Sequence, residues 1–245
     1  MSKRIVLVSD THGHRPSLPA GDVLLHAGDF TMSGSLKETL SAMEWLGVQA
    51  TKFEHVIITG GNHDFFMYHL SRELETEATR AFVQKHAGPN VVYLENELWA
   101  TELEGKVFSV YGSPIQPTFG EMAWNVERGP EIRRYWDNIP TLGIDVLMTH
   151  GPAHHVLDWV GRTRVGCVDL REALDRVQPK LHVFGHIHAA YGKARTFGPG
   201  GRTTECYNAA LCGESQDHNT YPLAHKPWVL DYDGENFVEA KPDDV

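Results

Sequence analysis

Histidine is unusually frequent in this sequence, and several of its 15 histidines stand in short clusters with aspartate, asparagine and glycine. Five clusters contain side chains of the kinds that bind metals: Ser9-Asp10-Thr11-His12, Gly28-Asp29, Gly61-Asn62-His63-Asp64, Thr149-His150-Gly151 and Gly185-His186-Ile187-His188. Carboxylate, amide and neutral imidazole ligands without thiolate suit Mn, Fe, Zn or Mg. Two ions about 3.5–4 Å apart need one ligand that reaches both, and the carboxylate of Asp29 is our candidate for that bridge.

Short apolar runs precede these clusters and indicate how the chain positions them. Six runs are rich in β-branched residues and too short for helices, which predicts buried strands. They are Ile5–Val8, Val23–His26, Val56–Thr59, Val107–Tyr111, Ile144–Met148 and Leu181–Phe184. All but the fourth end at a cluster. If these strands are parallel neighbours, the clusters meet at the carboxyl edge of the sheet, where ligands bind in open α/β folds.

Three amphipathic stretches predict helices between the strands. The first follows a capping box formed by Ser35 and Glu38. The second covers residues 70–85, and the third covers 169–177 with Asp169 as its cap. Alternating strands and helices predict an α/β fold with mixed sheets covered by helices.

The C-terminal third shows a different pattern, with strands joined by turns and no room for crossover helices. The predicted strands are Glu205–Ala209, Trp228–Tyr232 and Phe237–Ala240. Before them, Gly112–Arg134 is the one long irregular stretch. It is either a functional loop or a plain surface connection.

The composition bounds the class of protein. The chain of 245 residues is 41% hydrophobic and 22% charged, which suits one soluble domain spanning 1–245. A formal net charge of -10 argues against a long nucleic-acid partner but allows a small anionic substrate beside bound cations. The three cysteines suggest neither a disulfide framework nor a thiolate zinc site. Without a signal-peptide core or a long apolar stretch, we expect a cytoplasmic protein with no membrane partner.

The five clusters, in this order and each after a strand, resemble the motifs of calcineurin-like metallophosphoesterases. Each short motif alone is a weak signal, whereas all five in order are specific. The stretches 149–160 and 179–192 also resemble the subgroup of metallophosphoesterase-domain-containing proteins. This likeness spans nearly the whole chain. It implies a four-layer α-β-β-α sandwich of two mixed sheets flanked by helices.

The resemblance also implies a centre of two divalent metal ions, for which we favour Mn over Fe, Zn or Mg. The implied ligands of the first ion are Asp10, His12, Asp29 and His188. The implied ligands of the second ion are Asp29, Asn62, His150 and His186.

Two further residues of the third cluster receive catalytic roles from the resemblance. His63 matches the histidine that binds no metal and faces the leaving group, and Asp64 is expected to orient its imidazole. A metal-bridged hydroxide is expected to attack phosphorus, since metal coordination can lower the pKa of water from ~15.7 towards ~7. We expect His63 to assist by stabilising charge and by donating a proton to the departing oxygen.

The substrate is less closely defined by the sequence. The resemblance implies a phosphodiesterase acting on small nucleotides, including 2′,3′- and 3′,5′-cyclic nucleotides. A phosphomonoesterase or a nuclease on the same site is the alternative, and a scaffold with a degenerate metal site is a third reading. Asn62 and His63 are expected to contact substrate. Trp124 could stack on a base or anchor the loop, and Asn208 could contact substrate or sit in a buried turn. The sequence does not indicate an oligomeric state.

Overall fold

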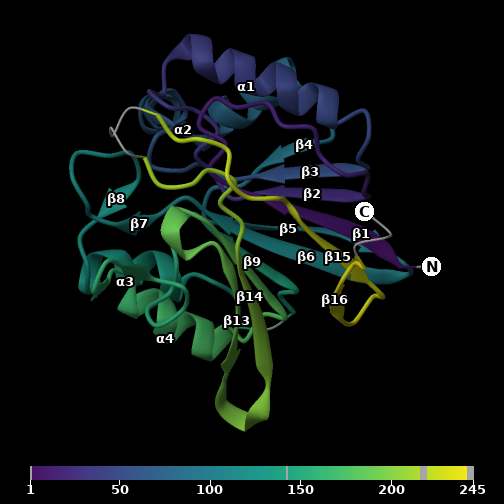
Figure 1. Cartoon of the computed structure of the whole chain (residues 1–245), viewed down its shortest axis with the longest axis vertical. Helices are drawn as coiled ribbons and strands as arrows, with labels where there is room; N and C mark the ends of the chain where they lie inside the picture. Colours follow the sequence, from purple (N-terminus) through teal and green to yellow (C-terminus); the bar gives the residue numbers. More distant parts are fainter. Residues whose placement is uncertain (1, 142, 216–219, 242–245) are drawn as a thin grey trace.

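Two six-stranded mixed sheets form the centre of the molecule (Figure 1). The structure is a computed structural model that describes residues 2–141, 143–215 and 220–241. The first sheet has the order β16 (Phe237–Glu239), β15 (Trp228–Tyr232), β1 (Lys3–Val8), β2 (Val23–His26), β3 (His55–Ile58) and β4 (Val91–Tyr93). Strands β1 to β4 are parallel to one another, whereas β15 runs antiparallel to both β1 and β16.

The second sheet also has a parallel centre, and it has an antiparallel strand at both edges. Its order is β13 (Gly192–Phe197), β14 (Thr203–Asn208), β12 (Leu181–Phe184), β9 (Val146–Thr149), β6 (Lys106–Ser113) and β5 (Glu97–Leu103). The four central strands are parallel, and β13 and β5 pair antiparallel at the edges. Parallel strands align their carboxyl ends, so the loops that follow them open on one side.

Helices cover the outer face of each sheet (Figure 1). They are α1 (Leu36–Gln49) and α2 (Phe65–Ala87) on the first sheet, and α3 (Pro130–Asp137) and α4 (Val168–Val177) on the second. The predicted four-layer α-β-β-α sandwich is therefore confirmed. Smaller elements are β7 (Gln116–Pro117) with β8 (Asn125–Val126), β10 (Trp159–Val160) with β11 (Thr163–Arg164), and the 3₁₀ turns η1 (His188–Ala190) and η2 (Pro199–Gly201).

Central strands such as β2, β3, β9 and β12 are largely apolar because both of their faces are buried. In β1, Ile5 and Leu7 belong to the core between the two sheets, whereas Val6 and Val8 pack with the residues beneath the helices. The same division holds in β2, where Leu25 faces the other sheet and Leu24 faces the helices. These two cores keep the strand ends in fixed positions.

The predicted elements are present, and their boundaries differ in detail. All nine predicted strands exist, with ends within two residues of those expected. The sequence patterns missed β4, β5 and β13, which are short or lie at sheet edges with alternating exposure. The stretch 112–134 is also less irregular than expected, since it contains β7, β8 and the start of α3.

One of the two predicted helix caps needs correction. The N-cap of α4 is Cys167, whose Sγ accepts the N–H of Leu170, whereas Asp169 accepts the N–H of Gly129. At α1 the N-cap is Ser35 as predicted, and its Oγ accepts the N–H of Glu38. The Glu38 carboxylate points back to the segment before the helix, where it accepts the N–H of Ser33 over 2.8 Å.

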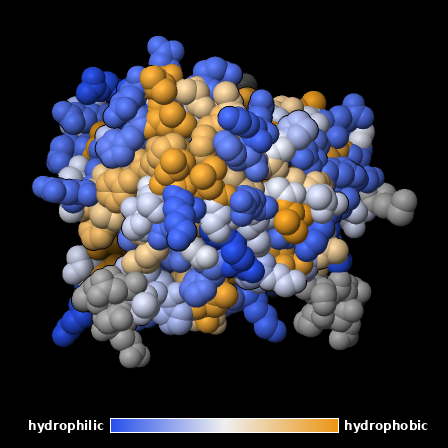
Figure 2. Space-filling view, turned by 90° about the horizontal axis from the view of Figure 1, so that it is seen from above, coloured by the Kyte–Doolittle hydropathy of each residue, from blue (hydrophilic) through white to orange (hydrophobic). Residues whose placement is uncertain are grey.

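The surface above α1 and α2 is mainly hydrophilic, with hydrophobic side chains gathered towards the side on which β7 and β8 lie (Figure 2). Leu36 and Val48 of α1 and Leu74 of α2 are among the exposed large hydrophobic residues. Among the described residues, no helix has the length and apolar character needed to cross a membrane.

Candidate metal centre and active site

The carboxyl ends of strands from both sheets bring the five clusters to one place. A parallel bridge joins Ser9, after β1, to Ala210, after β14 of the other sheet. His150, after β9, donates from Nδ1 to the carbonyl oxygen of Ala27, after β2, over 2.9 Å. The N–H of His186, after β12, donates to Asp10 Oδ2 over 2.9 Å. The loops of the two sheets therefore share one edge.

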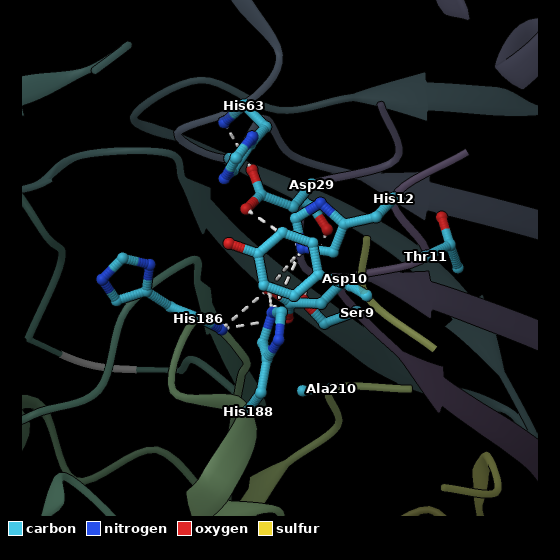
Figure 3. A network of polar contacts seen from close by, with 12 residues as sticks. Ser9, Asp10, Thr11, His12, Asp29, His63, His186, His188 and Ala210 are labelled. Carbon is cyan, nitrogen blue, oxygen red and sulfur yellow. Dashed lines mark hydrogen bonds and ion pairs between the residues drawn. The ribbon is translucent and has the colours of Figure 1, made fainter. Parts of the chain in front are cut away.

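The first expected ligand set forms a compact group. Figure 3 shows Asp10, His12, Asp29 and His188 turned towards one another. The Nε2 atoms of His12 and His188 lie 3.1 Å apart, and His188 Nε2 lies 3.1 Å from Asp10 Oδ1. His12 Nε2 lies 3.8 Å from both Asp10 Oδ1 and Asp29 Oδ2. These ligand atoms can face a single point between them.

The second expected set gathers around the amide of Asn62. Its Oδ1 lies 2.9 Å from His150 Nε2 and 2.8 Å from His186 Nδ1. His150 Nε2 also lies 3.4 Å from Asp29 Oδ2. Asp29 Oδ2 thus lies near a ligand nitrogen of each set. The structure brings all seven expected ligands together, and their coordination of metal stays a prediction.

The backbone is strained where it presents these side chains. Asp10, His12, Asp29 and His186 all have positive φ, between 40° and 69°. Such conformations are uncommon outside glycine and cost about 1–3 kcal/mol each, and they gather at functional sites. Gly185 permits the closest approach, because a Cβ there would overlap the Asp10 carboxylate. The turn after β12 can therefore reach the first ligand set only with glycine at this position.

Backbone carbonyls fix the orientation of three imidazoles. The Nδ1 atoms of His150, His188 and His63 face the carbonyl oxygens of Ala27, Gly213 and Met32, over 2.9, 3.0 and 2.7 Å. A carbonyl can only accept, so each Nδ1 carries the proton. In neutral imidazole this leaves Nε2 as a lone-pair donor, the form that ligates metals.

The buried charges of the site influence one another strongly. Burial alone would raise the pKa of Asp10 and Asp29, yet hydrogen bonds and charge from His188 and His150 hold each pKa below its usual value. Burial lowers the pKa of His12 to about 4 and that of His186 to about 3, so both imidazoles are neutral at pH 7. For His150 the nearby Asp29 charge outweighs burial and raises the pKa to about 9.

These residues fit divalent metal ions. Two ligand atoms about 2.1 Å from one ion lie roughly 3.0–3.5 Å apart. The spacings between ligand atoms given above run from 2.8 to 3.8 Å and so bracket this range. Three groups of side chains each place their ligand atoms within 4.8 Å of one another: Asp10, His12 and His188; His12, Asp29 and His63; and Asp10, Asp29 and His150. Two buried carboxylates amid imidazole nitrogens suit divalent cations, whose charge would offset theirs.

Asp64 makes different contacts from those expected. Its carboxylate accepts hydrogen bonds from the N–H groups of Asp29, Gly61 and Thr31 and from the Thr31 hydroxyl. The His63 imidazole instead directs its Nδ1 to the Met32 carbonyl. Asp64 therefore orients the loops that carry the ligands, and a backbone carbonyl orients His63.

Trp124 and Asn208, the two further substrate contacts that we expected, are both buried. Trp124 is 1% exposed, because its ring packs against Gly60 and against the edge of Tyr68 in the core. Asn208 is fully buried, donates to the carbonyl of Ile187 and accepts the N–H of Ala210. The structure therefore favours Trp124 as an anchor of its loop and Asn208 as a residue of a buried turn.

A pocket of about 490 Å³ lies beside the expected ligands and is lined by Asn62, His63 and His186. Its wall includes Phe119 and Tyr221, two aromatic residues for which the sequence indicated no function. The Tyr221 ring stacks on His12, with ring centroids 4.5 Å apart. The irregular stretch 112–134 thus supplies part of the pocket wall, whereas Tyr221 lies in a segment without any recognisable motif.

Comparison with known proteins agrees with this geometry. A family model for calcineurin-like phosphoesterases matches residues 3–190. The chain is 39% identical over 248 residues to Metallophosphoesterase domain-containing protein 1 of Homo sapiens, and equally to the Mus musculus protein of the same name. Each alignment covers 93% of this chain and 70% of the relative. The crystal structure of TT1561 of Thermus thermophilus superimposes with a TM-score of 0.54 at 12% identity, covering 85% of this chain and 89% of that one.

The ordered clusters, the four-layer fold and these similarities agree, which confirms the resemblance seen in the sequence. The family and the grouped ligand side chains together indicate divalent metal ions as cofactors. The chain therefore belongs to the calcineurin-like phosphoesterase family, whose reaction is the hydrolysis of phosphoester bonds.

Proposed function

We propose that this protein hydrolyses phosphodiester bonds of small nucleotides, including 2′,3′- or 3′,5′-cyclic nucleotides, with two divalent metal ions, for which manganese is our first choice. The observation that carries the proposal is the position of Asp29 Oδ2. It lies 3.8 Å from Nε2 of His12 and 3.4 Å from Nε2 of His150. One carboxylate oxygen between two ligand sets is what a pair of neighbouring ions requires.

The metal ligands follow from the two groups around Asp29. Asp10, His12 and His188 would hold one ion together with Asp29. Asn62, His150 and His186 would hold the other with the same carboxylate. When bound, the ions supply Lewis-acid activation of water and offset the negative charge of the phosphoryl group.

His63 is the residue that we assign to the leaving group. Its N–H donates to Asp29 Oδ1 over 2.7 Å and its Nδ1 faces the Met32 carbonyl, so both the backbone and the ring are held. The ring lines the pocket, and Nε2 is the nitrogen left for substrate. A protonated Nε2 would donate its proton to the departing oxygen, and general acid help of this kind is worth ~10²–10⁴ in rate.

The pocket and the charge of the chain favour a small substrate. A volume of about 490 Å³ lies in the range of roughly 300–1,000 Å³ that small-molecule sites occupy. The net charge of -10 opposes a long polyanion, whereas a single phosphate group at two cations is attracted locally. We propose a cytoplasmic location for the same enzyme, with no membrane or long nucleic-acid partner.

A substrate panel on the Mn²⁺-loaded protein tests the proposal. The panel consists of bis(p-nitrophenyl) phosphate, p-nitrophenyl phosphate, 2′,3′- and 3′,5′-cyclic AMP, and single-stranded DNA, compared by kcat/KM. We expect the diester to exceed the monoester and at least one cyclic nucleotide to exceed DNA. A clear preference for p-nitrophenyl phosphate would instead establish a phosphomonoesterase, and a preference for DNA would establish a nuclease.

A further inference from the structure

One wall of the pocket beside the second ligand set is apolar. Phe119, in the connection between β7 and β8, and Val160 of β10 line the pocket together with Ile187. Phe119 is nevertheless 58% exposed and Val160 is 47% exposed. The Phe119 ring centroid lies 5.7 Å from that of His186, which makes the aromatic face a direct neighbour of the expected metal ligands. Exposed apolar side chains gathered at one site usually mark a binding surface.

The loop that carries Phe119 is held in place before any ligand binds. The Asn125 side-chain amide donates to the carbonyl oxygens of Phe119 and Gly120, over 3.1 and 3.0 Å. The N–H of Thr118 donates to the carbonyl of Val126 over 3.0 Å. A ring carried on an ordered loop requires little rearrangement of the backbone when it stacks on a ligand, which favours binding.

The hairpin that carries Val160 is also braced. Arg164 of β11 pairs with the buried carboxylate of Asp158 over 2.6 Å, and its guanidinium lies 4.1 Å from the ring centroid of Trp159. These contacts fix both strands of the hairpin next to the pocket. Val160 therefore adds an ordered aliphatic surface to the wall that contains Phe119.

Gln116 supports the same loop from within the fold. It is 1% exposed, and its side-chain Nε2 donates to the carbonyl of Ala123 over 3.4 Å and to Oδ1 of Asn125 over 3.3 Å. Because the Asn125 amide in turn holds the carbonyl of Phe119, Gln116 is a positioning residue for this loop.

We propose that Phe119 forms a base subsite, in which its ring stacks on the nucleobase of the substrate. This inference rests on the proposed function only in placing the phosphate end at the metal centre. The subsite therefore favours a nucleotide over a sugar phosphate that carries no base.

Ligand binding to the Mn²⁺-loaded protein tests the subsite without requiring turnover. Isothermal titration calorimetry would compare AMP with ribose 5-phosphate in the wild type, in Phe119→Ala and in Phe197→Ala. Phe197 is the matched control because it is 70% exposed on β13 and does not line the pocket. Stacking on an aromatic side chain favours AMP by roughly tenfold or more. We expect this preference in the wild type and Phe197→Ala, and its loss in Phe119→Ala with unchanged binding of ribose 5-phosphate.

The subsite is overturned if AMP and ribose 5-phosphate bind wild type equally, or if Phe119→Ala keeps the wild-type preference. Such a result would reject the subsite alone, because the proposed function is tested separately by hydrolysis of bis(p-nitrophenyl) phosphate. Conversely, a base preference that depends on Phe119 in a protein without any phosphoesterase activity would reject the proposed function and retain the subsite.

Discussion

The carboxylate of Asp64 holds the backbone of Asp29, since Asp64 Oδ2 accepts the N–H of Asp29 over 2.9 Å. The same oxygen accepts the N–H of Gly61 over 2.9 Å, and Oδ1 accepts the N–H of Thr31 over 3.0 Å. One buried side chain thus ties the loop after β2 to the loop after β3. Because Asp29 carries the oxygen near both ligand sets, Asp64 is a positioning residue for the whole centre.

Asp64→Asn should weaken metal binding. The amide replaces one acceptor oxygen by an NH₂ group that faces a backbone N–H, so the Asp29 loop must move. Loss of such an outer hydrogen bond commonly lowers metal affinity by about 10–100-fold, and we expect that range in a Mn²⁺ titration. Asp145→Asn is the control, because Asp145 is also buried and accepts the N–H of Ser109, but lies before β9 at the opposite end of the sheet. Equal Mn²⁺ affinities for the two variants would contradict the positioning role.

His63→Ala should separate catalysis from metal binding. We expect the variant to retain the metal content of the wild type and to lose about 10²–10⁴ in kcat, because the proton donor to the leaving group is absent. His69→Ala, an exposed position on α2, should behave as wild type. His63 also lies in one group with His12 and Asp29. Loss of one metal per chain in His63→Ala would therefore make His63 a ligand and remove it from the leaving-group role.

Gly185→Ala should disrupt the first ligand set. The added Cβ would overlap the Asp10 carboxylate and the Ser9 hydroxyl, so the turn after β12 must move away from Asp10. We expect at least a tenfold loss of Mn²⁺ affinity in a folded protein, by analogy with other changes that misplace ligands. Gly151→Ala is the matched variant, since its Cβ would meet nothing closer than 3.8 Å. Wild-type metal affinity in Gly185→Ala would show that the two loops adapt freely.

His182 should make the folded protein sensitive to acid. The residue is fully buried in β12, its Nε2 lies 2.9 Å from Thr149 Oγ1, and burial lowers its pKa to about 3. In the unfolded chain its pKa is about 6.5, so between these values the unfolded state binds the proton. The stabilising contribution is therefore complete above about pH 6.5 and is lost as the pH falls towards 3.

Urea unfolding in EDTA measures this effect. The free energy of unfolding of the wild type should fall more steeply between pH 6 and pH 4.5 than that of His182→Asn, by about 1.4 kcal/mol per pH unit. EDTA removes bound metal from both proteins, so that release of metal does not contribute to either pH dependence. Parallel slopes in the two proteins would mean that His182 is already protonated in the fold.

The sequence predicted the parts of the fold that depend on periodicity and residue type. Apolar runs such as Ile5–Val8 are continuous because both faces are buried, and this signal survives in a single sequence. The edge strand β5 alternates between partly buried and exposed residues, which weakened its pattern. Cys167 caps α4 through a sulfur atom, which is not the usual cap chemistry and was missed.

In the candidate site too, residue type identified some features and could not identify others. The metal-binding residue types identified the seven expected ligands, because each follows a strand that delivers it to the shared edge. The group that orients His63 is the carbonyl of Met32, and a backbone group leaves no mark on residue type. Trp124 has a φ of 51° and turns its ring into the core, which spacing alone does not reveal. The spacing of Phe119 in the sequence does not indicate a function, and only its position beside His186 in the structure identifies it as a candidate.

The central claim is that Asp29 joins two ligand sets into a centre for two ions. Metal content after reconstitution with Mn²⁺, measured together with hydrolysis of bis(p-nitrophenyl) phosphate, tests it most directly. The wild type should hold two Mn²⁺ per chain and hydrolyse the diester, and Asp29→Ala should lose both properties. Fewer than one metal per chain in the wild type, with no hydrolysis after Mn²⁺ is added, would contradict the account.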